Sequence, residues 1–125
     1  MPSEKIRVLI ADDHRLFAEA LAAILATDER FEVVGQANNG ERAVELAAAE
    51  KPDVVLMDIS MPRLDGVEAA KQIKKKRRSS RVLMLTGSSS SADVARARDA
   101  GAEGYVTKDR IASELIDSIV EVARK

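Results

Sequence analysis

The sequence contains no cysteine, and its aromatic content is low: one tyrosine, two phenylalanines and no tryptophan in 125 residues. The lack of cysteine excludes disulfides and thiolate metal sites, and it is consistent with a cytoplasmic protein. The scarcity of aromatic rings disfavours a binder of single-stranded nucleic acid, because such proteins stack bases on aromatic side chains.

Long apolar runs are also missing. No run approaches the roughly 20 residues that a membrane-spanning helix needs, so no membrane partner is expected. Ser3, Glu4, Lys5 and Arg7 interrupt the start of the chain, which therefore does not resemble a signal peptide.

Neither sign of charge is in clear excess, since 20 Lys and Arg face 21 Asp and Glu for a formal net charge of -1. A nucleic-acid-binding domain usually carries a marked basic excess, so direct DNA binding by this chain is not expected. The one basic cluster, Lys74 to Arg78, falls at the expected end of a helix. We interpret it as a solvated helix terminus whose cations complement the macrodipole.

Short aliphatic runs alternate with amphipathic segments along the whole chain. Near-continuous aliphatic runs predict strands that are covered on both faces, as in a parallel sheet, and apolar residues at helical spacing predict helices. The expected strands are Ile6–Ala11, Phe31–Ala37, Val54–Met57, Val82–Leu85 and Gly104–Val106, and the expected helices are His14–Ala26, Glu41–Ala49, Val67–Lys76, Ala92–Ala100 and Ile111–Ala123.

Two of these helices have clear apolar faces. The first is expected to bury Leu16, Phe17, Ala20, Leu21, Ile24 and Leu25 on one face. The stripe of the last helix consists of Ile111, Leu115, Ile119 and Val122, widened by Ile116 and Val120. Its width predicts weak homodimerisation through the last helix, with burial in the core as the alternative explanation.

Turn and cap residues agree with these boundaries. Pro52 separates the second helix from the third strand, and Gly101 follows the fourth helix as a C-terminal cap. Ser90 and Asp93 have the spacing of a capping box, and residues 88–91 are interpreted as a loop before the fourth helix. Five strands, each followed by a helix, predict a single doubly wound α/β domain over residues 1–125. This is a flavodoxin-like (βα)5 fold with a parallel sheet of order 2-1-3-4-5.

Polar residues follow four of the expected strands. Asp12 and Asp13 follow the first, Asp58 the third, Thr86 the fourth and Lys108 the fifth. In an open parallel sheet these strand ends face one crevice, and ligands bind where the strand order reverses. The five side chains are therefore expected to converge.

Three carboxylates in one crevice repel one another unless a cation lies among them. Oxygen ligands suit Mg²⁺, which proteins hold with a few carboxylates, waters and a substrate phosphate. A neutralised cluster leaves Asp58 able to act as nucleophile toward a phosphoryl group, while the Lys108 ammonium and the Thr86 hydroxyl hold its oxygens.

Each of these residues also has an ordinary explanation. Asp12 and Asp13 are suitable caps for the first helix, Asp58 is suitable for a turn, and Thr86 is a common strand residue. Lys108 taken singly is expected in solvent. The combination at four successive strand ends favours the functional interpretation.

The same residues resemble the signature of response-regulator receiver domains over essentially the whole chain. The resemblance is carried by Asp12-Asp13, Asp58 with Met61-Pro62, Asp65-Gly66, Leu85-Thr86 and Tyr105-Val106-Thr107-Lys108. It implies Asp58 as the phosphoacceptor and a sensor histidine kinase as the donor. It implies a metal site formed by Asp12, Asp13, Asp58 and the Ser60 main-chain carbonyl, with Asp13 as a direct ligand. It further implies Lys108 as the phosphate-binding lysine and Thr86 and Tyr105 as switch residues acting on the fourth helix, fifth strand and fifth helix.

The stretch from Ala11 to Phe17, together with Lys108-Asp109, resembles the NarL/FixJ branch, whose members usually carry a helix-turn-helix output domain. No output domain follows Lys125, so the chain is expected to be either an excised receiver or a stand-alone one. The resemblance to this branch favours the excised receiver, whose DNA binding would depend on a missing output domain. Many other receivers have a proline, preceded by a cis peptide bond, where this chain has Asp109.

Two rival functions fit less well. A phosphohydrolase of the haloacid-dehalogenase type places a second Asp two residues after the nucleophile, and this chain has Ser60 there. We therefore expect no enzyme beyond metal-assisted phosphorylation and dephosphorylation of the chain itself. A dinucleotide-binding module needs a glycine-rich turn after the first strand, where the acid pair repels a pyrophosphate. His14 is interpreted as a local hydrogen-bonding or packing residue, with phosphotransfer as the alternative.

Overall fold

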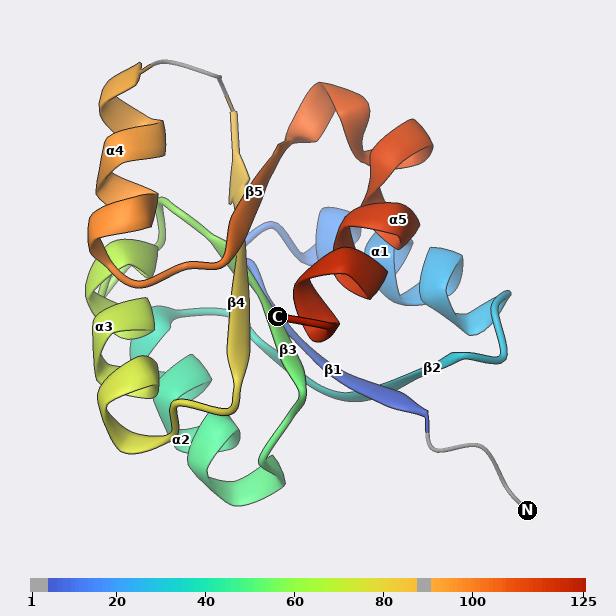
Figure 1. The fold of residues 1–125 in the computed structure, drawn as a ribbon, viewed down its shortest axis with the longest axis horizontal. Coiled ribbons are helices and arrows are strands. Elements are labelled where there is room, and N and C mark those ends of the chain that lie inside the picture. Colours follow the sequence, from blue (N-terminus) through green and yellow to red (C-terminus); the bar gives the residue numbers. More distant parts are fainter. Residues whose placement is uncertain (1–4, 88–90) are drawn as a thin grey trace.

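Five parallel strands form the centre of the molecule in the computed structural model, which describes residues 5–87 and 91–125 (Figure 1). The strands are β1 (Ile6–Ala11), β2 (Phe31–Ala37), β3 (Val54–Asp58), β4 (Arg81–Thr86) and β5 (Gly104–Thr107). Their order is β2-β1-β3-β4-β5, and each neighbouring pair is parallel. The predicted fold class and strand order are confirmed.

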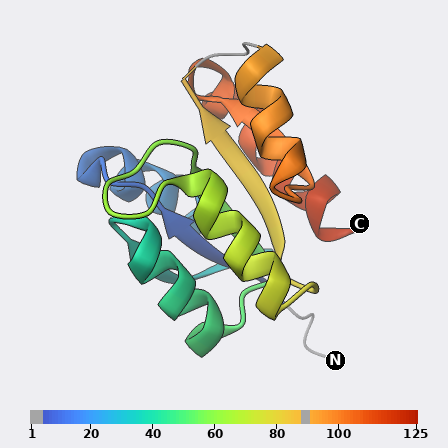
Figure 2. The same cartoon turned by 90° about the vertical axis from the view of Figure 1, so that its left-hand side faces the viewer.

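The helices cover both faces of the sheet. They are α1 (Arg15–Ala26), α2 (Gly40–Glu50), α3 (Gly66–Lys76), α4 (Ser91–Asp99) and α5 (Ile111–Ala123), with a short 3-10 turn, η1 (Lys108–Arg110), that the sequence did not predict. Figures 1 and 2 show α1 and α5 on one face and α2, α3 and α4 on the other. No helix in the described ranges is long and apolar enough to cross a membrane.

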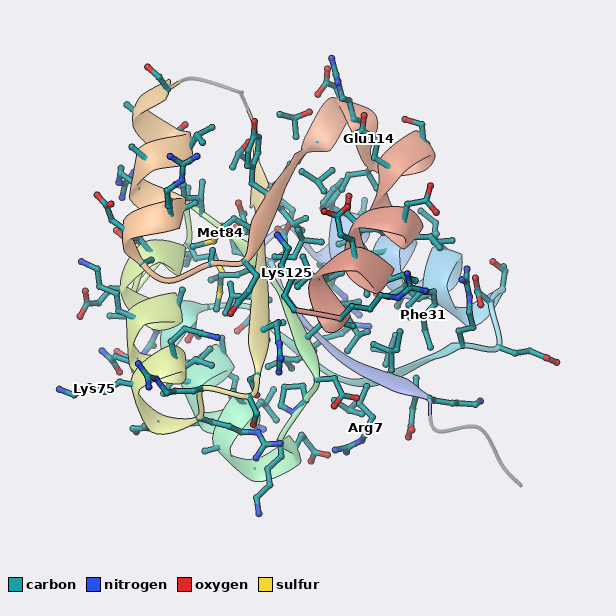
Figure 3. The ribbon with its side chains drawn as sticks, viewed as in Figure 1. Arg7, Phe31, Lys75, Met84, Glu114 and Lys125 are labelled. Atoms are coloured by element: carbon teal, nitrogen blue, oxygen red, sulfur yellow. The ribbon has the colours of Figure 1, made fainter. Side chains whose placement is uncertain are left out.

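The aliphatic runs form strands because both of their faces are covered. All residues of β3 are buried, and β4 is buried from Val82 to Thr86. Alternate residues enter two apolar clusters on opposite sides of the sheet. Figure 3 labels one side chain of each: Met84 lies on the α3 and α4 side, and Phe31 on the side of α1 and α5. Each large side chain removed from water in this way contributes roughly 1.5–3 kcal/mol.

Every predicted strand and helix boundary is confirmed to within one residue. Gly101 follows α4 with φ of +91°, a left-handed conformation that glycine adopts without strain. Asn39 and Asp65 cap α2 and α3 by accepting hydrogen bonds from backbone N–H groups. Ser90, the predicted cap of α4, lies outside the described residues, and Ser91, expected in the loop, is the first residue of α4.

The predicted apolar face of α1 is wrong at its start. Leu16 is 81% exposed, and Ala20 is also exposed, whereas Ala18, Leu21 and Leu25 are buried. Leu16 lies nine residues before Leu25, which at about 100° per residue places the two on opposite sides of the helix. The sheet covers the side that carries Leu25, so Leu16 points to solvent.

The basic cluster is solvated only in part. Lys75 points away from α3 into solvent (Figure 3), and Lys76 and Arg78 are exposed. Lys74 instead contacts Glu103, with 2.5 Å between Nζ and Oε2, and donates to the carbonyl of Ser80 at 3.0 Å. The interpretation as a solvated terminus is therefore wrong for Lys74, which ties α3 to the segment before β5.

Burial in the core accounts for most of the apolar stripe on α5. Its four regularly spaced members are buried, and Ile116 and Val120 are partly buried against the same cluster. Homodimerisation through α5 stays a prediction.

Two helix N-termini approach the loop after β3 closely enough to require glycine. A Cβ on Gly40 would lie 1.8 Å from the carbonyl oxygen of Leu64, and one on Gly66 would lie 2.0 Å from that of Asp58. The Gly66 N–H also donates to the Ile59 carbonyl at 3.0 Å. These contacts fix the backbone immediately after Asp58.

Gly66→Ala is therefore expected to lower the free energy of unfolding by about 3 kcal/mol, because backbone rather than a flexible side chain must move. Gly87→Ala is the matched control, since a Cβ there meets none of the described atoms within 4 Å, and its effect should stay within about 0.5 kcal/mol. Urea unfolding of the three proteins measures both values. Equal losses in the two variants would contradict the close approach at Gly66.

Candidate functional site

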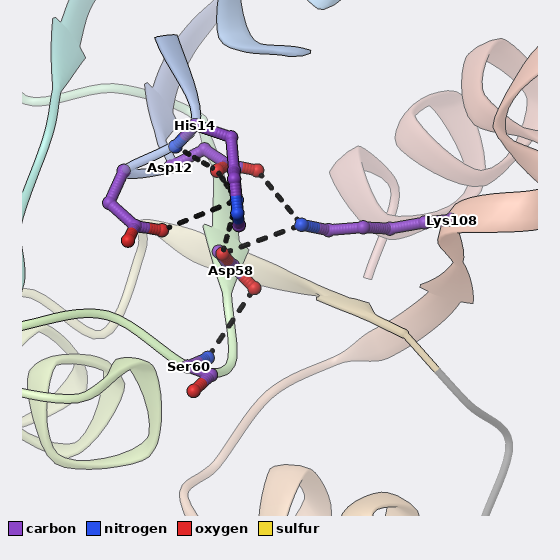
Figure 4. Close-up of polar contacts among 6 residues, drawn as sticks. Asp12, His14, Asp58, Ser60 and Lys108 are labelled. Carbon is purple, nitrogen blue, oxygen red and sulfur yellow. Dashed lines mark hydrogen bonds and ion pairs between the residues drawn. The ribbon is translucent and has the colours of Figure 1, made fainter.

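Side chains from three of the strand ends meet in one polar crevice (Figure 4). Asp12 follows β1, Asp58 ends β3, and Lys108 follows β5. The Lys108 Nζ lies 3.4 Å from Asp12 Oδ2 and 3.5 Å from Asp58 Oδ2. The predicted convergence of these three residues is confirmed, and the interpretation of Lys108 as a solvated lysine is wrong.

The register of the sheet explains why residues so distant in sequence meet. Ala11 pairs with Met57, Asp58 with Leu85, and Thr86 with Thr107. The strands therefore end level with one another, and the first residues beyond them face the same space. Beyond β3, the Ile59 N–H donates to the Leu85 carbonyl at 3.1 Å, which holds the start of the following loop against β4.

Burial separates the members of this group. Asp12 and Asp58 are 1% and 3% exposed, and Thr86 is fully buried at the end of β4. Asp13, Ser60 and Tyr105 are exposed, and Lys108 is intermediate. The buried Asp12 Oδ2 accepts no hydrogen bond from the described residues. Lys108 is its partner in an ion pair.

The surroundings of Asp58 disfavour its charge. Burial, followed by the nearby charge of Asp12, raises the pKa of the Asp58 carboxyl from 3.8 to about 6. The Lys108 ammonium and the Ser60 N–H, which donates to Asp58 Oδ1 at 3.4 Å, act in the opposite direction. One ammonium thus fails to compensate two buried carboxylates.

The group has the composition of a site for a divalent cation. Asp12, Asp13, His14 and Asp58 each offer one ligand atom, and these atoms lie within 4.8 Å of one another. The buried Asp12 oxygen without a hydrogen bond and the raised pKa of Asp58 are both relieved by added positive charge. The carboxylate oxygens suit a hard cation such as Mg²⁺, so the residues fit this ion.

The alternative in which the acid pair caps α1 is wrong. His14 occupies the cap position of α1, and no side chain makes a capping hydrogen bond there. Asp12 Oδ1 instead accepts the backbone N–H of His14 at 2.8 Å, and the His14 Nδ1 lies 3.2 Å from the same oxygen. The local hydrogen-bonding role predicted for His14 is confirmed, but its position within the carboxylate group was not predicted.

Phe17 is a second residue whose place at the site was not predicted. The Lys108 Nζ lies 4.7 Å from the centroid of the Phe17 ring, within the range of a cation–π contact. Asp13 lies outside α1, so no helical spacing in the sequence signalled this contact. The sequence pattern assigned Phe17 to the core face alone, and it does also pack against the cluster beneath α1 and α5.

Tyr105 and Thr86 lie beside the crevice. Tyr105 is 44% exposed on β5, the strand next to β4, which Thr86 ends. Tyr105 lines a groove with Gly87, Asp109, Arg110 and Glu114. The two residues are thus on adjacent strands, and their role as switch residues stays a prediction.

Comparisons with known proteins agree with this geometry. Residues 8–120 match the family described as response regulator receiver domain. The transcriptional regulatory protein DegU from Brevibacillus brevis is 41% identical over 120 residues, which cover 96% of this chain and 51% of DegU. The chain spans about half the length of the curated relatives it matches.

Solved structures are similar over nearly the whole chain. The signal receiver domain of the response regulator NarL from Mycobacterium tuberculosis has a TM-score of 0.93 and 35% identity, with 98% of both chains covered. CheY in a CheX-CheY-BeF3-Mg²⁺ complex from Borrelia burgdorferi has a TM-score of 0.88 and 26% identity, covering 95% of this chain and 90% of that one.

The family match spans most of the chain, and the acidic pocket and Lys108 occupy the strand ends where the motifs predicted them. DegU and NarL indicate the branch. The chain belongs to the response regulator receiver domain family of two-component systems, in its NarL/FixJ branch.

Proposed function

We propose that residues 1–125 form one receiver domain that accepts a phosphoryl group on Asp58 from a sensor histidine kinase in the cytoplasm. The observation that carries this proposal is the position of Asp58 at the end of β3, buried beside Asp12 and 3.5 Å from the Lys108 ammonium. The charge of this carboxylate is poorly compensated. Such a carboxylate gains from a bound cation and is suited to act as the nucleophile toward a phosphoryl group.

We further propose that Mg²⁺ binds to Asp13, Asp58 and the Ser60 main-chain carbonyl, with Asp12 completing the acidic pair. When bound, Mg²⁺ neutralises the carboxylates and the charge on the phosphoryl oxygens. Asp13, exposed at the mouth of the crevice, is accessible to an ion that keeps part of its water shell.

The other groups position the phosphoryl group. A carboxylate oxygen of Asp58 forms the new bond to phosphorus while the bond from phosphorus to the donor breaks, which leaves an acyl phosphate. The Lys108 ammonium, already directed at Asp58, holds one phosphoryl oxygen, and the Thr86 hydroxyl holds another. Phosphoryl transfer requires little beyond this positioning and charge neutralisation.

The chain is a signalling domain rather than a classical enzyme. Rapid hydrolysis of an aspartyl phosphate requires a carboxylate that acts as general acid and base. Two residues after Asp58 this chain has Ser60, whose hydroxyl does not supply that function. We propose that the acyl phosphate persists long enough to change the surface of α4, β5 and α5. This surface then controls either an output domain, which is usually DNA-binding in the NarL/FixJ branch, or a partner protein.

Incubation with Mg²⁺ and acetyl phosphate should add one phosphoryl group to Asp58, labile to hydroxylamine because it is an acyl phosphate. Asp58→Asn should abolish the modification, whereas Asp109→Asn, which alters an exposed acid outside the pocket, should retain it. Intact mass and peptide mapping give the site. Label on His14 or on a serine would refute the proposal.

Without metal, Asp58→Asn should stabilise the fold at pH 7.5. The raised pKa means that the folded protein holds the Asp58 proton more tightly than the unfolded chain, so stability falls as pH rises from 3.8 to about 6. Above this window the penalty amounts to about 2–3 kcal/mol, and Asn removes it.

Urea unfolding in a chelator between pH 4.5 and 7.5 measures this effect, with Asp109→Asn as control. The advantage of Asp58→Asn should shrink below pH 6, where the parent is protonated, and with saturating Mg²⁺. A variant less stable than the parent at pH 7.5 would show that Lys108 overcompensates the two carboxylates.

Thr86→Ala should still accept phosphate on Asp58 but respond weakly, because its hydroxyl links the phosphoryl group to the end of β4. Thr107→Ala is the matched control, since it removes a buried hydroxyl from the residue paired with Thr86. Tyr105 is the only tyrosine, so its ring signals report the response to beryllofluoride by NMR. Equal shifts in parent and Thr86→Ala would refute the coupling.

A further inference from the structure

The His14 imidazole lies among the carboxylates of the pocket (Figure 4). A site for Mg²⁺ alone needs only oxygen ligands and no nitrogen. Its Nδ1 is 3.2 Å from Asp12 Oδ1, 3.5 Å from Asp13 Oδ1 and 4.0 Å from Asp58 Oδ2. Each of the three acids therefore has an oxygen within 4.0 Å of one ring nitrogen.

These separations suit ligands of a single ion. Nitrogen and oxygen ligands bind zinc at about 2.0–2.2 Å in a tetrahedral arrangement, so two such ligands lie about 3.4 Å apart. The distances to Asp12 and Asp13 are close to this value. The distance to Asp58 is longer, and the His14 side chain, which is 68% exposed, has the freedom to turn toward it.

The imidazole and the ammonium use different oxygens of Asp12. Lys108 pairs with Oδ2, whereas His14 contacts Oδ1. An ion bound beside His14 would therefore use an Asp12 oxygen that Lys108 does not contact, and this oxygen also accepts the His14 backbone N–H at 2.8 Å. The buried Asp12 Oδ2 accepts no hydrogen bond from the described residues, and its ion-pair partner there is the Lys108 ammonium at 3.4 Å.

Nitrogen changes which ions the pocket prefers. Carboxylates and water suit Mg²⁺, whereas imidazole suits Zn²⁺ and other borderline transition ions. We propose that His14 makes this pocket a site for Zn²⁺, bound by Nδ1 together with carboxylate oxygens of Asp12, Asp13 and Asp58, in competition with Mg²⁺. This inference rests on the proposed function, because it uses the same carboxylates. It assigns His14 no part in holding Mg²⁺.

Such an ion acts on signalling by occupying the phosphoacceptor. An Asp58 oxygen that ligates Zn²⁺ is not free to attack phosphorus, and the imidazole takes a coordination position that a phosphoryl oxygen otherwise needs. Zn²⁺ is therefore expected to slow the phosphorylation of Asp58 that Mg²⁺ supports. In His14→Phe, this inhibition should require a higher Zn²⁺ concentration.

The first measurement needs no variant. His14 is the only histidine in the chain, so its two ring ¹⁵N signals are assigned without ambiguity. One equivalent of Zn²⁺ at pH 7.5 should shift the Nδ1 signal far more than the Nε2 signal, and saturating Mg²⁺ should leave both near their starting positions. Unchanged ring signals at saturating Zn²⁺ would overturn the proposal.

The second measurement compares affinities in the parent, His14→Phe and His14→Gln. Calorimetric titration should show Zn²⁺ binding weakened at least about tenfold in both variants, which is the lower end of the loss caused by removing even an outer partner of a ligand. Mg²⁺ affinity should change by less than about twofold, which also shows that the variants are folded.

The outcomes separate this inference from the proposed function. Equal Zn²⁺ affinities in parent and variants, with normal Mg²⁺ binding and phosphorylation of Asp58, would overturn the role of His14 alone. Loss of Mg²⁺ affinity in both variants, in parallel with Zn²⁺, would make His14 a general ligand and overturn the selectivity. Absence of Mg²⁺ binding and of Asp58 phosphorylation in the parent would refute the proposed function itself.

Discussion

Two buried carboxylates facing one ammonium are the constraint on which the rest of this site depends. Asp12 and Asp58 are almost completely removed from water, and Lys108 approaches both at about 3.5 Å. Removing a charge from water is costly unless it is fully compensated, and the raised pKa of Asp58 shows that this compensation is incomplete. The remaining negative charge attracts a cation, and the bound cation then allows a phosphoryl group to bind beside Asp58.

The scaffold maintains this unfavourable arrangement because the backbone around it has little freedom. Asp12 follows β1 and Asp58 ends β3, and both strands are held by neighbours in the middle of the sheet. The close approach of Gly66 to the Asp58 carbonyl fixes the chain beyond the strand. The backbone that holds the two buried carboxylates is thus constrained on both strands, as a preorganised site requires.

The residues around the pocket determine which ions and groups enter it. Phe17 places an aromatic ring 4.7 Å from the Lys108 Nζ, and His14 places a nitrogen beside all three acids. Both lie at the start of α1, next to the exposed Leu16. In the proposed function the acids and the lysine carry out the reaction, and in the proposed zinc site the first turn of α1 adds a nitrogen ligand.

Much of this protein follows from sequence periodicity alone. Buried runs such as Val54–Met57 specify strands because every residue must be covered. The alternation of strands with helices determines the parallel order. Asp12, Asp58 and Lys108 then converge because parallel strands end at one edge of the sheet. Leu16 was misplaced because a run of apolar residues does not reveal which side of the helix the sheet covers. Lys74 was misplaced because its partner Glu103 is 29 residues away. The place of His14 depends on a side-chain direction at the first turn of α1, and only the tertiary structure decides that direction, by bringing Asp58 within 4.0 Å of a residue 44 positions earlier in the chain.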